Sequence, residues 1–227
     1  IIAGGRATVS QQIVRVDRES RAPLDPETEA AMEAAVEAAL SGIDGLILSD
    51  YGGGVLTDGV RRRVIEACQR AAVTTMVDSR YAIRAFTGVD YVKQNDAELA
   101  AALGRSLSTE AEVRLAGREL LERLGAKGVL VTRGAKGMTL FEAAGAVTDI
   151  PVPDKSEVYD VSGAGDTSVA AFMLALAAGA SPVDAARIAN VAAGIAVRKL
   201  GTATVSAAEL CDVLGKQEGK TDEGYPG

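Results

Sequence analysis

Two glycines and an alanine, Gly163-Ala164-Gly165, stand directly before Asp166 and an apolar helix. Glycine is unfavourable at a helix start unless another group must approach the backbone closely. Free N–H groups at a helix N-terminus attract anions, and a neighbouring carboxylate can take a proton from an alcohol. Phosphoryl transfer needs this combination of an anion cradle and a base. The same local sequence is equally typical of a tight turn whose aspartate only interacts with the helix dipole.

The composition narrows the chemistry further. The 227 residues are 48% hydrophobic, which is enough for one α/β core. The absence of histidine excludes a Ser–His–Asp triad, a Cys–His pair and a histidine-bound metal, so acid–base work falls to other side chains. A net charge of −7 argues against nucleic acid as a partner. Cys68 and Cys211 lack metal-ligand spacing, and we expect both to be reduced core residues of a cytoplasmic protein.

The sequence shows no sign of a membrane protein, and its first residues do not resemble the start of a complete domain. No apolar run is long enough to span a membrane, and no signal peptide is recognisable. The sequence starts at Ile1-Ile2-Ala3 without an initiator methionine, as the interior of a domain does. We therefore expect a further segment upstream.

Strand-like and helix-like segments alternate along most of the chain, which predicts a mostly parallel sheet covered by helices on both faces. Strands are predicted within 1–18 and at 46–48, 73–77, 90–93, 128–132, 138–141 and 145–152. Helices are predicted at 25–40, from Thr57, at 95–103, from Thr109, up to Gly179, at 181–199 and at 206–214. Ligands of such sheets bind beyond the carboxyl ends of the strands. Four side chains or turns that follow strand ends should therefore share one rim: Asp50, Asp78, Asn95 and Gly134.

Several motifs together resemble the PfkB/ribokinase family of sugar kinases. They are Asp160-Val-Ser-Gly-Ala-Gly-Asp166, Asn95-Asp-Ala-Glu98, Thr132-Arg-Gly134-Ala-Lys-Gly137 and Asn190-Val-Ala-Ala-Gly194. Within the family, the sequence is most similar to the D-glycero-β-D-manno-heptose 7-phosphate kinases. The matching phrases include Gln11–Asp17, Ser49–Gly52, Glu157–Asp160 and Lys199–Ser206. The resemblance implies a ribokinase-like core over residues 19–215, the remnant of a small β lid over 1–18 and a flexible tail over 216–227.

The resemblance also implies transfer of the γ-phosphoryl group of ATP to a sugar or sugar-phosphate hydroxyl, with Mg²⁺. Asp166 would be the base, and Gly163, Ala164 and Gly165 would form the anion hole. Asn95 and Glu98 would organise Mg²⁺ and the phosphates, and Asp50 would face the sugar. Thr132, Gly134 and Gly137 would border the nucleotide, with Asn190 near the adenine. A monovalent cation such as K⁺ would be held by Asp160 and Ser162. We further expect a homodimer, no nucleic-acid partner and no membrane partner.

Plainer explanations exist for each of these residues. Asn95 and Glu98 could form a helix capping box, and Gly134 and Gly137 could be hairpin turn residues. Asn190 could be a polar helix residue without a ligand, while Asp50 and Asp160 could serve a turn and a helix cap. At the level of function, the acceptor could instead be ribose, fructose or a nucleoside. A non-catalytic sugar- or nucleotide-binding domain and a nicotinamide-binding Rossmann enzyme are further alternatives, although the latter lacks the third glycine of its fingerprint.

Overall fold

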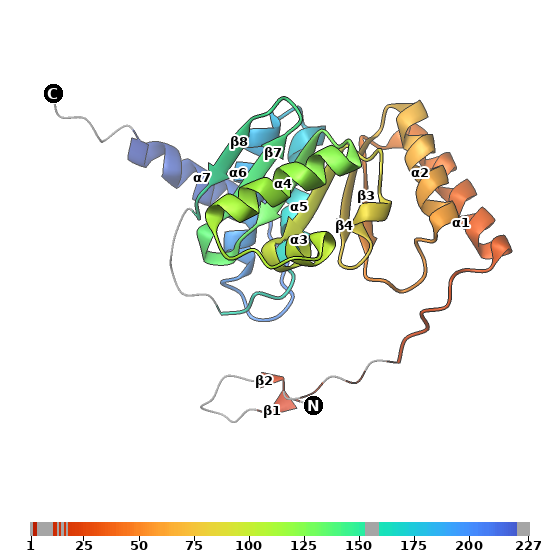
Figure 1. Ribbon diagram of the computed structural model, residues 1–227. Helices are drawn as coiled ribbons and strands as arrows, with labels where there is room; N and C mark the ends of the chain where they lie inside the picture. The colour runs from red at the N-terminus through yellow and green to blue at the C-terminus, as the bar shows by residue number, and fades with distance from the viewer. Residues whose placement is uncertain are drawn as a thin grey trace.

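The computed structural model describes residues 2–3, 11–12, 14, 16, 18–152 and 159–221; within these, the side chains of 2–3, 11–12 and 217–221 are left out. A six-stranded sheet runs in the order β3-β4-β5-β6-β7-β8 (Figure 1). Its strands are β3 (Gly45–Asp50), β4 (Thr74–Ser79), β5 (Tyr91–Asn95), β6 (Gly128–Thr132), β7 (Met138–Glu142) and β8 (Val147–Ile150).

The first four strands are parallel and the last two are antiparallel additions. Strands β3 to β6 pair in parallel, whereas β7 and β8 continue the sheet as an antiparallel meander. The four parallel strands end with Asp50, Ser79, Asn95 and Thr132, and the register pairs Asp50 with Ser79 and Asn95 with Thr132. The predicted common rim is thereby confirmed, because these carboxyl ends lie side by side.

Helices cover both faces of the sheet, as the sequence predicts. The helices are α1 (Pro26–Ala39), α2 (Asp58–Ala71), α3 (Asp96–Leu103), α4 (Glu110–Leu124), α5 (Ala164–Ala177), α6 (Pro182–Ala196) and α7 (Ala207–Thr221). Alternate residues of one strand serve opposite faces: in β4, Val77 joins the core beneath α1 to α4, whereas Met76 joins the core beneath α5 and α6. The central strands β4 to β7 are therefore mostly buried on both sides, which explains their nearly continuous apolar runs.

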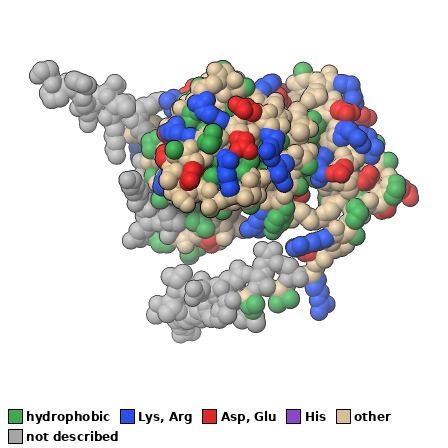
Figure 2. All heavy atoms as spheres, in the orientation of Figure 1, with side chains coloured by type: hydrophobic (Ala, Val, Ile, Leu, Met, Phe, Trp, Pro, Cys, Tyr) green, Lys and Arg blue, Asp and Glu red, His purple; other side chains and the backbone are tan. Residues whose placement is uncertain are grey.

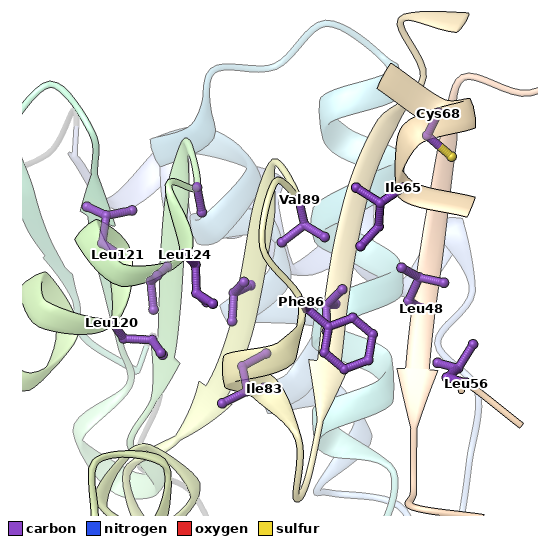
Figure 3. Close-up of a cluster of buried hydrophobic side chains, with 14 of the residues drawn as sticks. Leu48, Leu56, Ile65, Cys68, Ile83, Phe86, Val89, Leu120, Leu121 and Leu124 are labelled. Carbon is purple, nitrogen blue, oxygen red and sulfur yellow. The ribbon is translucent and has the colours of Figure 1, made fainter. Parts of the chain in front are cut away.

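The larger core lies between the sheet and helices α1 to α4. Figure 3 shows side chains from α2, β3, α4 and the segment after β4 converging there, including Ile65, Leu48, Leu120 and Phe86. The smaller core is formed by α5 and α6, where Val169, Phe172 and Met173 are buried on the face that their spacing predicts. This smaller core fixes α5, and hence the glycine turn at its start, against the sheet.

Helix starts follow the sequence closely, whereas one helix end does not. Asp25, Thr57, Asn95, Thr109 and Ser181 all cap helices with their side chains. The last helix continues to Thr221, beyond the predicted end near Leu214. Gly215 therefore does not end it, because one glycine weakens a helix without breaking it.

Two further predictions concern the chain ends and the cysteines. The predicted strands near the N-terminus are represented by an antiparallel pair, β1 (Ile2–Ala3) and β2 (Gln11–Gln12), and much of the remaining segment lies outside the described residues. Cys68 is free and buried as expected. The expectation for Cys211 is wrong, since it is free but exposed. It lies between Leu210 and Asp212 on α7, a helix that is only partly covered.

The charged side chains are mixed over the surface that Figure 2 displays. Basic and acidic groups alternate there rather than gathering into an area of one sign. Within the described part of the chain, no helix is long and apolar enough to cross a membrane.

Candidate active site at the carboxyl ends of the strands

Asp166 lies exposed in the first turn of α5, next to the rim of the parallel strands. Its Oδ1 accepts a hydrogen bond of 2.8 Å from the Tyr51 hydroxyl, which belongs to the loop after β3. Its Oδ2 forms no hydrogen bond with any described residue. A carboxylate with one oxygen held and the other open to solvent can accept a proton from a bound alcohol.

The glycine turn before Asp166 offers unpaired N–H groups. Gly163 has a φ of +78°, which favours glycine, and caps α5 without any side-chain hydrogen bond. The N–H of Ala164 donates to the carbonyl of Val161. The N–H groups of Gly165 and Asp166 have no partner among the described residues, as is usual for the second and third positions of a helix. Two backbone donors and the helix dipole thus face solvent at one point, as an anion hole requires.

A buried lysine lies against this turn. Lys93, on β5, has a side chain that is only 6% exposed, and its Nζ is 3.0 Å from Asp78 Oδ2 and 3.8 Å from Glu98 Oε2. A Cβ added to Gly165 would be 3.1 Å from the same Nζ. The ammonium group therefore lies beside the Gly165 backbone and raises the positive potential at the predicted anion hole. Burial raises the pKa of the Asp78 carboxyl, and the Lys93 charge opposes that rise.

A cavity of about 330 Å³ extends from the glycine turn along the ends of β6 and β7. Its walls contain the predicted nucleotide residues Thr132, Gly134, Gly137 and Asn190 together with Ala164 and Gly165 of the predicted anion hole. The structure thus brings together six residues that the sequence places in three separate motifs. The cavity is large enough for much of a nucleotide, and it reaches the glycine turn that immediately precedes Asp166.

Gly134 and Gly137 also serve the turn between β6 and β7. Both have positive φ, at +55° and +85°. No residue with a side chain can replace Gly137 unless the backbone moves, because an added Cβ would be 2.1 Å from the carbonyl oxygen of Ile150. The hairpin explanation therefore holds, because the turn needs these glycines. The same turn forms a wall of the cavity, and contact with a nucleotide there stays a prediction.

Asn95 and Glu98 form the capping box that the sequence allows. The Asn95 side chain accepts from the Glu98 N–H, and Glu98 Oε2 accepts from the Asn95 N–H, both at 2.8 Å. The same Glu98 oxygen faces Lys93. Capping thus holds the Glu98 carboxylate at the rim, within 3.8 Å of the Lys93 ammonium.

Asn190 and Asp50 are both buried and both engaged in internal hydrogen bonds. Asn190, on α6, donates from Nδ2 to the carbonyl of Pro151 at 2.7 Å while lining the cavity. Asp50 Oδ1 accepts from the Gly52 N–H at 2.9 Å, and Oδ2 accepts from the Ser79 hydroxyl at 2.7 Å. Asp50 therefore shapes the loop that carries Tyr51, as its turn explanation expects.

Asp160 links the segment before the glycine turn to the segment after α6. Its Oδ1 accepts from the Ser162 N–H at 2.8 Å and its Oδ2 from the Gly201 N–H at 3.1 Å. These hydrogen bonds, with that from Ser162 first, lower the pKa of the Asp160 carboxyl. The described residues contain no cluster of three or more acidic, cysteine or histidine side chains that could hold a metal ion.

Two residues at this site have no assigned role in the sequence analysis. In the sequence, Lys93 is one residue of a predicted strand. Tyr51 is one residue of a glycine-rich loop. Only the parallel register that pairs Asp78 with Lys93 could have indicated the first. Nothing local could have indicated the second, because Tyr51 and Asp166 are 115 residues apart.

This fold and this rim define a ribokinase-like carbohydrate kinase domain. The profile of the pfkB family of carbohydrate kinases matches residues 6–209, and the chain belongs to that family. It is 41% identical over 214 residues to the bifunctional protein HldE of Pelobacter propionicus and 42% identical over 212 residues to that of Rhodospirillum rubrum. These matches cover 93% and 92% of this chain but only 43% and 42% of the relatives, so the chain spans less than half their length.

Solved structures agree with the fold. Phosphofructokinase-2 of Escherichia coli in complex with potassium superposes with a TM-score of 0.74 at 26% identity, covering 86% of this chain and 64% of that protein. Arabidopsis thaliana ribokinase, solved with ribose and ATP, gives a TM-score of 0.69 at 24% identity, with 85% and 60% covered. The second comparison bears on the fold alone.

Proposed function

We propose that this protein transfers the γ-phosphoryl group of ATP to a sugar hydroxyl, with D-glycero-β-D-manno-heptose 7-phosphate as the acceptor and the 1,7-bisphosphate as the product. The observation that carries the activity is the single cavity that joins the predicted nucleotide residues to the glycine turn beside Asp166. The sequence resemblance and the HldE relatives support the choice of acceptor.

The reaction follows from the positions of the charged groups. The acceptor oxygen attacks the γ-phosphorus, the bond from that phosphorus to the bridging oxygen breaks, and ADP leaves with the electron pair. Asp166 Oδ2 takes the proton of the acceptor hydroxyl. The free N–H groups of Gly165 and Asp166, together with the Lys93 ammonium, stabilise the charge on the phosphoryl oxygens.

The donor set of the rim fits a magnesium ion held mainly by phosphates. Mg²⁺ keeps most of its waters and usually takes one or two protein carboxylates, and Glu98 supplies one at the rim. When bound, Mg²⁺ neutralises phosphate charge. Asp160 and Ser162 remain our candidates for a K⁺ site, because the hydrogen bonds that Asp160 accepts hold together the two loop segments whose carbonyls would complete it.

The alternative functions have less support. A Rossmann enzyme would carry its glycine turn after the first strand of the sheet, whereas this turn follows β8, the last. A non-catalytic binding domain would not need an exposed carboxylate beside unpaired N–H groups and a buried lysine. Ribose, fructose or a nucleoside as acceptor uses the same chemistry and can be decided by assay. The division into lid, core and tail, and the homodimer, also remain predictions.

The test is an acceptor panel with the full chain. ADP release is measured with MgATP and, in turn, the heptose 7-phosphate, ribose, fructose, fructose 6-phosphate and adenosine. We expect kcat/KM for the heptose 7-phosphate to exceed that for every other acceptor by at least about 100-fold, the discrimination that a built polar pocket supplies. A preference for another sugar would refute the acceptor, and no ADP release with any of them would refute the activity.

A further inference from the structure

The hydrogen bond between Tyr51 and Asp166 links the loop after β3 directly to the start of α5. The phenolic oxygen donates to Asp166 Oδ1 at 2.8 Å across 115 residues of sequence. The Tyr51 side chain is 63% exposed, so this hydroxyl could bond with water instead. An exposed phenol that is directed to one carboxylate oxygen, with the other oxygen left open, is a specific arrangement rather than core packing.

The loop that carries Tyr51 is anchored on both sides of it. Before it, Asp50 is bonded through its carboxylate to Gly52 and Ser79, and its carbonyl accepts from the Arg80 N–H at 3.1 Å. After it, Gly52 has a φ of +73° and lies under the ring of Tyr81, so closely that an added Cβ would be 2.9 Å from that ring. Tyr51 is therefore held in place by its neighbours and can in turn hold another group.

We propose that Tyr51 is a positioning residue for the reaction, which holds Asp166 Oδ1 so that Oδ2 is directed to the acceptor hydroxyl. The inference rests on the proposed function, because it gives Asp166 the role of base. Without the hydrogen bond from Tyr51, the exposed carboxylate of Asp166 at the helix start would rotate freely. Fixing one oxygen removes that rotational freedom before the acceptor binds, and a base misplaced by about 1 Å can cost a factor of about 100 in rate.

The hydrogen bond also affects the phenol itself. The bond to Asp166 is the main cause of a raised pKa for Tyr51, with partial burial and the negative charges of Asp166 and Asp78 adding to it. Loss of a proton from Tyr51 would place a phenolate against a carboxylate. The phenol therefore stays a donor throughout the neutral pH range, as a positioning role requires.

The kinetic test replaces Tyr51 by phenylalanine in the full chain. Tyr51→Phe keeps the ring and removes only the hydroxyl. We expect kcat to fall by about 10- to 100-fold with KM for ATP changed by less than about twofold, because the nucleotide cavity is untouched. Tyr81→Phe is the matched control, since Tyr81 lies on the same rim without a bond to Asp166, and its kcat should stay within about twofold of the wild type. A Tyr51→Phe enzyme with wild-type kcat would overturn the proposal.

A double mutant separates action through Asp166 from a general effect on the loop. If Tyr51 works only through the base, Tyr51→Phe should cost less than about twofold in residual activity when added to Asp166→Asn. A further loss of tenfold or more would show that Tyr51 acts elsewhere and would overturn the positioning role. If Asp166→Asn is as active as the wild type, the role of Asp166 as the base fails and the inference with it, whereas the kinase activity itself is refuted only by the acceptor panel. If Asp166→Asn is inactive while Tyr51→Phe is normal, the inference alone fails.

An ultraviolet titration of the phenols provides a readout that a merely structural residue would not move. Subtracting the titration curve of Tyr51→Phe from that of the wild type isolates the ionisation of Tyr51. We expect this ionisation at a pH above the ordinary pKa of tyrosine. The same difference in the Asp166→Asn background should move to lower pH. A Tyr51 transition that is identical in both backgrounds would contradict the contact on which the inference stands.

Discussion

Lys93 shows how one residue can serve both the stability and the chemistry of this site. A buried ammonium is costly unless it is paired, and Asp78 supplies the partner at 3.0 Å. The Lys93 ammonium lies next to Gly165, 3.1 Å from where a Cβ on that residue would be. A positive charge that is already desolvated and fixed needs no reorganisation when phosphate arrives, and this is what makes it useful for phosphoryl transfer.

Replacing Lys93 by methionine should therefore cause two separable losses. We expect kcat/KM for ATP to fall by at least about 100-fold through lost charge stabilisation. We also expect the free energy of unfolding to fall by about 3 kcal/mol, because the mostly buried carboxylate of Asp78 is left without a partner. Steady-state kinetics and urea denaturation measure the two effects.

The double variant Lys93→Met with Asp78→Asn is the control for that prediction. It removes both charges, so most of the lost stability should return while the activity should not. Recovery of activity together with stability would mean that Lys93 acts only as a structural partner of Asp78.

At the scale of elements, the turn between β6 and β7 forms part of the wall of the cavity that we propose for the nucleotide. Its two glycines adopt positive φ for the same chain reversal, but their surroundings differ. Gly137 lies against the carbonyl of Ile150 on the neighbouring strand, whereas Gly134 has no atom within 4 Å of an added Cβ.

This difference predicts unequal effects of alanine at the two positions. Gly134→Ala should lower the free energy of unfolding by about 1–2 kcal/mol, because a residue with a side chain is strained in the left-handed conformation. Gly137→Ala adds a clash with backbone and should cost at least about 3 kcal/mol. Urea midpoints compare the two variants, and equal destabilisation would argue against the β7–β8 arrangement seen here.

The elements themselves could largely be predicted from the sequence, since they rest on local rules. Asn95-x-x-Glu98 and Thr109-x-x-Glu112 both form the capping boxes that their spacing indicates. Side-chain pairings between distant elements could not be predicted in the same way. Lys93 and Asp78 meet through strand register, and Tyr51 and Asp166 meet through the packing of α5 on the sheet; neither is a local property. The exposure of Cys211 was missed for the same reason, because it depends on how much of α7 is covered.

At the scale of the whole molecule, the rim collects residues from all parts of the described core onto one edge. Binding of MgATP there should stabilise the folded protein. At a concentration 100 times the dissociation constant, one ligand adds about 2.7 kcal/mol. For a chain of this size, that corresponds to a rise in Tm of roughly 5–10 °C. Differential scanning fluorimetry measures it, with MgGTP at the same concentration as a comparison, and no shift with any nucleotide would contradict the assignment of the cavity.

The replacement of Asp166 by asparagine tests the central claim most directly. Asn keeps the size of the side chain and can still accept from Tyr51, but it cannot take a proton. The account predicts that kcat for acceptor phosphorylation falls by about 10²–10⁴-fold, while the rise in Tm with MgATP stays as in the wild type. Activity within tenfold of the wild type would contradict the claim that this carboxylate activates the acceptor hydroxyl.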